Sequence, residues 1–239
     1  MLQAGDRLAQ QGQDDEVQVL ETSRIGACSQ GPEMMVYPEG VHYAGMTVDD
    51  LPYIVEEHFL KGRIAQKFIL PIRSIKDEEL TAPTAKEIRV VLRNCGVIDP
   101  ENIEDYIAQE GYMALAKVIT EMTSDDVINE IKKSGLRGRG GAGFPTFLKW
   151  TFTKQEKNDT RFVICNADEG DPGAFMNRRV LESDPHSVIE GMIIAAFAIG
   201  AKQGYIYCRA EYPIAVKTLN IAIQQAKGLG LLGENIMGT

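Results

Sequence analysis

The sequence predicts an α/β protein in two parts: a small ββα unit, then a larger α/β domain with parallel strands. Three observations predict this. Two short apolar runs around a Pro-Glu-Gly turn precede an amphipathic helical pattern, a charged stretch with two prolines has no periodicity, and the last third alternates strand and helix patterns. The expected boundaries are 1–70 for the first unit, 71–85 for a linker and 86–239 for the second domain.

The composition is that of a globular protein with an acidic balance. The 239 residues carry 25 Lys+Arg against 34 Asp+Glu, a formal net charge of -9, and 44% are hydrophobic. Such a chain buries a core, whereas intrinsic disorder and a disulfide scaffold are disfavoured. It also lacks the basic footprint that phosphate contacts require, so we expect no nucleic-acid partner.

The N-terminus and the cysteines predict a cytoplasmic protein. An acidic triplet at 14–16 stands where a secretory signal would be apolar. The longest apolar stretch, 192–201, is about half of the ~20 residues that cross a bilayer, so we expect no direct membrane insertion. The cysteines form no CxxC pair, and their spacing predicts neither a zinc site nor a disulfide framework: Cys28, Cys95, Cys165 and Cys208.

The first unit is expected to hold a hairpin and then a helix. The strands are short apolar or alternating runs, at 16–22, 34–37 and 41–43. Thr47 with Asp50 three residues later is a capping-box pattern, and it opens an amphipathic helix that ends at Gly62.

The second domain is expected to begin with helices and to end with alternating strands and helices. Pro100 opens one helix, another covers 112–121, and the pair Thr123 and Asp126 opens a third that ends at Gly135. Each later strand precedes a helix with proline at its first position: 161–165 before Pro185, and 205–208 before Pro213, whose helix would bury Val216, Leu219, Ile223 and Ala226. This order predicts parallel pairing through a right-handed crossover.

A glycine-rich segment between two helical patterns is the sharpest local signal. Residues 138–143 (GRGGAG) satisfy GxGxxG, but the dinucleotide-binding turn of that pattern follows a strand, and a helix precedes this one. Glycines allow the backbone to approach a flat or phosphorylated ligand, and Arg137, Arg139 and Lys149 add positive charge. The alternative is a flexible loop between helices. The entropic cost of ordering four glycines in six residues favours a ligand.

An acidic loop directly after the first parallel strand is the second signal. Residues 166–175 are NADEGDPGAF, and ligands of open α/β sheets bind beyond the carboxyl ends of the strands. These side chains can accept hydrogen bonds from ribityl or ribose hydroxyls and from an amide, but they would repel phosphate: Asn166, Asp168, Glu169 and Asp171. The alternative is a solvated acidic turn.

Four motifs in order carry a resemblance to a known family. GLRGRGGAGFPTFLKW, NADEGDPGAF, ESDPH and YIYCRAEYPIAV resemble the flavin-bearing, NADH-oxidising subunit of respiratory complex I, NAD(P)-linked hydrogenases and formate dehydrogenases. RVVLRNCGVIDPENIEDYIAQEGYMAL resembles the segment before that core, so the likeness covers about residues 86–239. It implies the N-terminal part of a Rossmann-like domain that binds FMN and NADH.

The resemblance implies a role for each loop residue. One group approaches FMN and its phosphate: Gly138, Gly140, Gly141 and Lys149. Arg139 and Gly143 of the same loop are also expected to bind the cofactor. A second binds the ribityl chain and the flavin ring: Asn166 and Asp168. A third surrounds NADH, with Phe144 and Phe152 at the adenine and Glu169 and Asp171 near the ribose or nicotinamide. In that family a hydride passes to the flavin, and electrons leave singly through iron–sulfur clusters, so no catalytic acid–base residue is expected.

The first third resembles the second half of a thioredoxin-like [2Fe-2S] ferredoxin module, over CSQGPEMMVYPEGVHYAG and a helix ending in LKGR. Cys28 fits that module's final ligand, but Arg24 stands at the partner position. A lone cysteine cannot hold a cluster that takes four ligands, so we expect no [2Fe-2S] cluster and no other metal here.

Two hypotheses follow from the resemblance. In the first, the chain is a truncated or split subunit that oxidises NADH or NADPH by hydride transfer to FMN, inactive when isolated. The family's second flavin loop and [4Fe-4S] ligands would lie outside it, and partner subunits, including a [2Fe-2S] thioredoxin-like one, would attach it peripherally to a membrane. In the second, the chain is a non-catalytic remnant or assembly module that binds partner subunits but neither flavin nor cluster.

Overall fold

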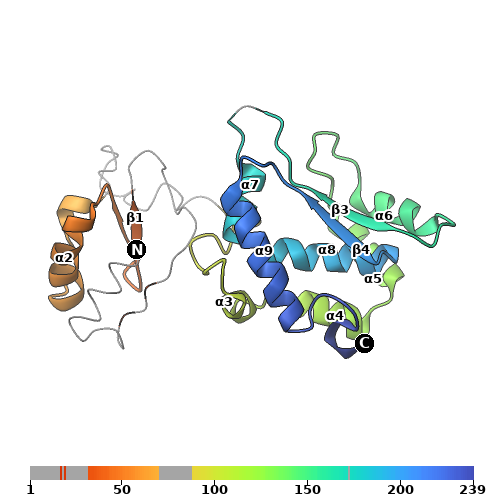
Figure 1. Cartoon of the computed structure of the whole chain (residues 1–239), viewed down its shortest axis with the longest axis horizontal. Helices are drawn as coiled ribbons and strands as arrows, with labels where there is room; N and C mark the ends of the chain where they lie inside the picture. The colour runs from red at the N-terminus through yellow and green to blue at the C-terminus, as the bar shows by residue number, and fades with distance from the viewer. Residues whose placement is uncertain (1–16, 18, 20–31, 70–87, 172) are drawn as a thin grey trace. The chain divides into compact units, whose positions relative to one another are not determined.

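The structure, a computed structural model, describes residues 17, 19, 32–69, 88–171 and 173–239 (Figure 1). The chain divides into two compact units, Met1–Asp99 and Pro100–Thr239. The expected linker at 71–85, most of the expected strand at 16–22, and Cys28 lie outside the described residues, so the predicted domain boundaries stay a prediction. No helix of the described residues is long and apolar enough to cross a membrane.

The described part of the first unit is the expected hairpin followed by helical turns. Its elements are β1 (Glu33–Val36), β2 (Val41–Ala44), η1 (Val48–Asp50), α2 (Leu51–Ile54), η2 (Val55–Leu60) and η3 (Gln66–Phe68). The two strands are antiparallel. The Asp50 carboxylate accepts the Thr47 backbone N–H at 2.9 Å and the Thr47 hydroxyl at 2.6 Å, as the capping pattern predicts. The helix differs from the prediction in one respect, because its second half is π-helical.

Apolar side chains from the hairpin, the helical turns and the segment around η3 form the core of this unit: Val36, Tyr43, Met46, Ile54, Ala65 and Phe68. Tyr43 is fully buried, and its hydroxyl accepts the Ala65 N–H at 3.0 Å and lies 2.7 Å from Nδ1 of His58. The polar atoms that enter this core are therefore paired.

The second unit begins with helices and ends with a βαβα segment. Its elements are α3 (Ile103–Ala108), α4 (Met113–Glu121), α5 (Ser124–Ser134), α6 (Thr146–Gln155), β3 (Phe162–Asn166), α7 (Met176–Ser183), α8 (Pro185–Ile199), β4 (Gln203–Tyr207), α9 (Pro213–Gly228) and η4 (Ile236–Gly238). β3 and β4 pair in parallel, with Phe162 opposite Gln203 and Asn166 opposite Tyr207. The parallel sheet confirms the predicted α/β fold class.

Three details of this unit differ from the expectations. α3 begins at Ile103 rather than at Pro100, because the Asn102 side chain accepts the N–H of Glu104 at 3.0 Å and caps the helix there. α7 was not expected. The buried face of α9 is displaced by about one residue from the expected stripe. Val216 is 39% exposed, and the buried positions are mostly small: Ala215, Thr218, Leu219, Ala222 and Ala226.

A buried carboxylate joins α8 to α3 and to the start of α4. Glu190 is 7% exposed, and one of its oxygens accepts the Tyr106 hydroxyl at 2.6 Å and the Tyr112 N–H at 3.0 Å. Its other oxygen accepts the Leu115 N–H at 3.0 Å. A negative charge at the start of α4 also interacts favourably with the helix dipole. Glu190 therefore fixes the first helices of this unit against α8.

His186 extends the same buried network to α9. Its Nε2 lies 3.1 Å from Oε1 of Gln225, an acceptor, and its Nδ1 lies 2.9 Å from the Tyr112 hydroxyl. These partners suit a neutral ring that carries its proton on Nε2. Burial lowers the pKa of His186, in agreement with a neutral imidazole.

Candidate functional site

The glycine-rich loop connects α5 to α6, so a helix precedes it and another follows it, as expected. Gly138 donates its N–H to the Phe144 carbonyl at 2.8 Å, and the Arg137 guanidinium donates to the Gly143 carbonyl at 2.9 Å. These bonds close the segment into a compact loop. Gly141 and Gly143 have φ values of 101° and 58°, which side chains disfavour, so this loop shape requires glycine.

The loop presents backbone donors beside positive charge. Among the described residues, the N–H groups of Gly140, Gly141 and Gly143 find no intramolecular acceptor. A Cβ atom added to Gly138 would lie 3.3 Å from the Lys149 ammonium nitrogen, so the lysine stands directly against the loop backbone. The N-terminus of α6 follows the loop at once and adds the positive end of its dipole. Such an arrangement is suited to an anion.

Two exposed aromatic side chains flank the same region. Phe144 ends the loop and is 41% exposed, and Phe152 on α6 is 54% exposed. Lys149 and Phe152 are three residues apart on α6 and therefore share one of its faces. The structure thus places the predicted cationic and aromatic residues on the loop and on the helix that it opens.

The acidic loop begins at the carboxyl end of β3, and its residues have different environments. Asn166, Asp168 and Asp171 are exposed, whereas Glu169 is 6% exposed. The Glu169 carboxylate accepts the N–H groups of Asn177 at 3.0 Å and Arg178 at 3.3 Å, in the first turn of α7. Glu169 therefore caps α7.

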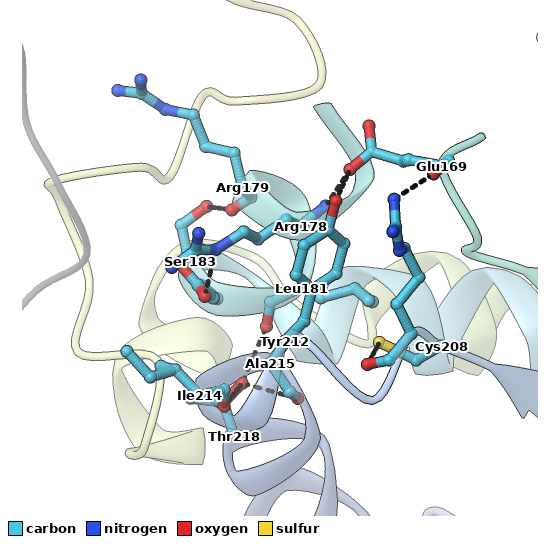
Figure 2. A network of polar contacts seen from close by, with 12 residues as sticks. Glu169, Arg178, Arg179, Leu181, Ser183, Cys208, Tyr212, Ile214, Ala215 and Thr218 are labelled. Carbon is cyan, nitrogen blue, oxygen red and sulfur yellow. Dashed lines mark hydrogen bonds and ion pairs between the residues drawn. The ribbon is translucent and has the colours of Figure 1, made fainter. Parts of the chain in front are cut away.

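The electrostatics of Glu169 agree with this role. Burial pushes the pKa of this carboxyl up, but the N–H donors of α7 and the Tyr212 hydroxyl outweigh burial and hold the pKa below its usual value. The carboxylate is thus ionised at the N-terminus of α7, where the helix dipole favours a negative charge. Figure 2 shows Glu169 directed toward Tyr212.

A shallow depression lies where β3 and β4 end, and residues after both strands line it: Asp168, Glu169, Gly170, Tyr207, Cys208, Arg209, Ala210 and Glu211. Tyr207, Arg209 and Glu211 were not among the expected site residues. Their position just after the second parallel strand could have indicated them, because the carboxyl ends of neighbouring parallel strands meet at one edge of a sheet. In Figure 1 the loop before α6 and the loop after β3 project from the same side of this unit.

Within 32–69, 88–171 and 173–239, no group of three or more His, Cys, Asp or Glu side chains is arranged to hold a metal ion. Cys28, which fits an iron–sulfur ligand position by resemblance, lies outside these ranges. Cys165 and Cys208 lie at the ends of the parallel strands, and burial raises the pKa of both thiols.

The part of the chain that holds the glycine-rich loop and the acidic loop is similar to known proteins. Residues 131–236 match the family model of the Nuo51 FMN-binding domain. This region is therefore similar to that family. The match includes the glycine-rich loop, α6, the acidic loop and the segment after β4, that is, the motifs on which the resemblance rested.

Curated relatives agree with the family match. The chain is 57% identical over 159 residues to NADP-reducing hydrogenase subunit HndC of Solidesulfovibrio fructosivorans. The aligned region covers 66% of this chain and 32% of that protein. It is 45% identical over 141 residues to an NADH-quinone oxidoreductase subunit of Escherichia coli, with 59% and 32% covered. The chain spans about a third of the length of these relatives. A crystal structure of an NAD+-reducing [NiFe]-hydrogenase matches 83% of this chain and 31% of that chain, at 28% identity and a TM-score of 0.47.

Proposed function

We propose that the second unit binds FMN and contributes to the oxidation of NADH or NADPH. The observation that carries this proposal is the anion cradle, which we define as the glycine-rich loop and the start of α6. There, unpaired backbone N–H groups of the described loop and the Lys149 ammonium lie together, and the absence of a Cβ atom at Gly138 leaves room for the ammonium. A dianionic phosphate fits such a cradle. The family match to an FMN-binding domain supports the choice of ligand.

The phosphate group would interact with the loop that carries Arg139, Gly140, Gly141, Gly143 and Lys149. Gly138 has a different part in this proposal, because its N–H already bonds the Phe144 carbonyl. Gly138 would instead leave room for the Lys149 ammonium, which a larger side chain would crowd. The loop would therefore bind the phosphate through charge and backbone N–H groups together.

The exposed residues of the acidic loop would accept hydrogen bonds from hydroxyl groups. Asn166 and Asp168 follow β3 and are exposed, which suits contacts with the ribityl chain and the flavin ring. Phe144 and Phe152 would flank the adenine of the dinucleotide, and Asp171 would lie near its ribose or nicotinamide. A contact between Glu169 and the dinucleotide is a prediction from the sequence that the structure does not test. We propose a supporting role for Glu169 in its place, because its carboxylate already accepts N–H groups of α7.

The chemistry would belong to the cofactor, since bound FMN can take a hydride from nicotinamide and release electrons one at a time. The residues of this chain would bind and orient the two ligands. The named relatives are subunits of a hydrogenase and of a quinone oxidoreductase. We therefore propose that the chain works with partner subunits, including a [2Fe-2S] thioredoxin-like one, whose clusters take the electrons.

Flavin titration tests the proposal directly. FMN and riboflavin differ by the phosphate, and binding quenches or shifts flavin fluorescence. The wild-type chain should bind FMN more tightly than riboflavin. Lys149→Ala should weaken FMN binding by about ten- to a hundred-fold, since a charge-assisted hydrogen bond contributes about 1.5–3 kcal/mol, and should leave riboflavin binding unchanged. Lys157→Ala removes an exposed lysine just after α6 and serves as the matched control.

Two results would contradict the assignment. The first is an equal affinity for FMN and riboflavin, or an FMN affinity that Lys149→Ala leaves unchanged. Either would show that the glycine-rich loop does not bind the phosphate. No saturable binding of either flavin, even with partner subunits present, would favour the alternative of an assembly module without cofactor.

A further inference from the structure

Tyr212 joins the acidic loop to the segment after β4. Its side chain is buried, and its hydroxyl lies 3.1 Å from Oε2 of Glu169 and 3.1 Å from the carbonyl oxygen of Ala174 (Figure 2). The hydroxyl carries one proton, so the two acceptors share it. A single tyrosine, 43 residues from Glu169 in the sequence, thus contacts the acidic loop at two points.

Arg209 strengthens the same junction. Its guanidinium donates to the backbone carbonyl of Glu169, lies 5.7 Å from the centre of the Tyr212 ring, and pairs with Glu211 at 3.1 Å. Arg178 also lies over the Tyr212 ring, at 5.5 Å, and pairs with Glu182 at 2.8 Å. Both guanidinium groups are within the range of favourable cation–π contact, which restricts the orientation of the ring.

The anchored residues lie on both sides of Asp168. Ala167 is buried and donates its N–H to the Tyr207 carbonyl at 2.8 Å. Glu169 is also buried and accepts hydrogen bonds from Tyr212 and Arg209. The Asn177 side chain donates to the Asp168 carbonyl at 3.1 Å. The backbone of Asp168 is thereby fixed while its side chain stays exposed. Such a fixed backbone lets an exposed carboxylate meet a ligand with little loss of conformational entropy.

From these contacts we propose that Tyr212 and Arg209 are positioning residues: they hold Glu169, and through it the ligand-facing part of the acidic loop. Their role in ligand binding rests on the proposed function, whereas their hold on the loop does not. Glu169 then acts through the loop and α7 rather than by contact with the dinucleotide.

Hydrogen–deuterium exchange on the whole chain tests the hold without any ligand. Tyr212→Phe removes the hydroxyl and keeps the ring that both guanidinium groups contact. Exchange in peptides that cover 168–178 should become about ten-fold faster, while the rest of the second unit exchanges as in the wild type. Arg209→Lys, which keeps the charge but loses the planar fork, should loosen the same peptides. Tyr205→Phe, on an exposed ring of β4, is the matched control.

Flavin titration of the same variants tests the positioning role. Tyr212→Phe should weaken FMN and riboflavin by the same factor, about three- to ten-fold, because both carry the ribityl hydroxyls. Lys149→Ala should weaken FMN alone. Unchanged exchange in the rest of the second unit of Tyr212→Phe separates this positioning role from a general loss of stability.

The outcomes test the hold on the loop, the positioning role and the proposed function separately. Unchanged exchange in both Tyr212→Phe and Arg209→Lys overturns the proposed hold on the loop. Faster exchange with unchanged affinity for both flavins overturns the positioning role. If the wild-type chain binds neither flavin, the proposed function fails, and the exchange result alone still establishes or rejects the hold.

Discussion

Glu190→Gln tests the buried junction between α8 and α4, on which the arrangement of the second unit depends. One carboxylate oxygen of Glu190 accepts two donors, from Tyr106 and Tyr112, and the other accepts the Leu115 N–H. An amide offers only one acceptor oxygen. At least one of the three donors would therefore lose its acceptor and face an NH2 group in a site that is 7% exposed.

The expected loss follows from these bonds. A buried donor without a partner costs about 1–3 kcal/mol, and bonds that lose a charged acceptor weaken from about 1.5–3 to about 1 kcal/mol each. Removing a buried charge also removes its desolvation cost, which offsets part of this loss. We expect the free energy of unfolding to fall by about 2–3 kcal/mol. Tyr106→Phe leaves the carboxylate with its two backbone donors, so it should cost less, about 1–2 kcal/mol.

Urea denaturation followed by tryptophan fluorescence measures this loss of stability in the second unit of the chain. Trp150, the single tryptophan of the sequence, lies on α6 and packs against the core cluster of Val118, Val127, Ile128 and Ala198. Glu130→Gln is the control, because Glu130 is exposed and pairs only loosely with the exposed Lys133, at 3.6 Å. A loss below about 0.5 kcal/mol for Glu190→Gln, or one equal to that of the control, would refute the reasoning.

Three further predictions concern the loops and caps. Gly138→Ala should weaken FMN binding several-fold in a fluorescence titration, because its methyl group would stand 3.3 Å from the Lys149 ammonium nitrogen; an equal loss for riboflavin would contradict this. Folding lowers the pKa of Glu169, so the unfolded chain binds that proton first and stability is lost as the pH falls below the usual value of 4.5. In Glu169→Gln, the free energy of unfolding should therefore depend less steeply on pH in the acid range. Urea denaturation at several acid pH values measures this slope, and a slope equal to that of the wild type would count against the prediction. Thr123→Ala should cost about 1 kcal/mol by removing the acceptor of the Asp126 N–H at 3.2 Å, and an unshifted thermal midpoint would disprove the cap.

Local signals predicted the elements well where the partners are close in sequence. Thr123 and Asp126 form the expected capping box, and the Asp184 side chain accepts the Ser187 N–H at 3.1 Å at the start of α8. Gly135 and Gly200 end their helices with positive φ values of 68° and 71°. Each of these signals acts over three or four residues, so the sequence shows it directly.

Signals that depend on distant residues were missed. α7 carries few apolar residues, and its cap comes from Glu169, seven residues before its first residue, so no capping box announces it. The buried face of α9 was displaced because Ala215 and Thr218 pack closely against other elements. The Thr218 hydroxyl donates to the Leu181 carbonyl of α7 at 2.9 Å. Small and hydroxyl-bearing residues give a weak apolar pattern, although they allow helices to approach each other.

The sequence by itself determined the α/β class, the parallel order of β3 and β4, and the residue types of the two loops, because periodicity, caps and glycine-rich turns act over short distances. Only the tertiary structure decided which side chains hold those loops. Glu169 meets Tyr212 across 43 positions, and Glu190 meets Tyr106 across 84. A carboxylate can be buried only where several donors converge on it, and chain folding alone brings donors from such separate segments together.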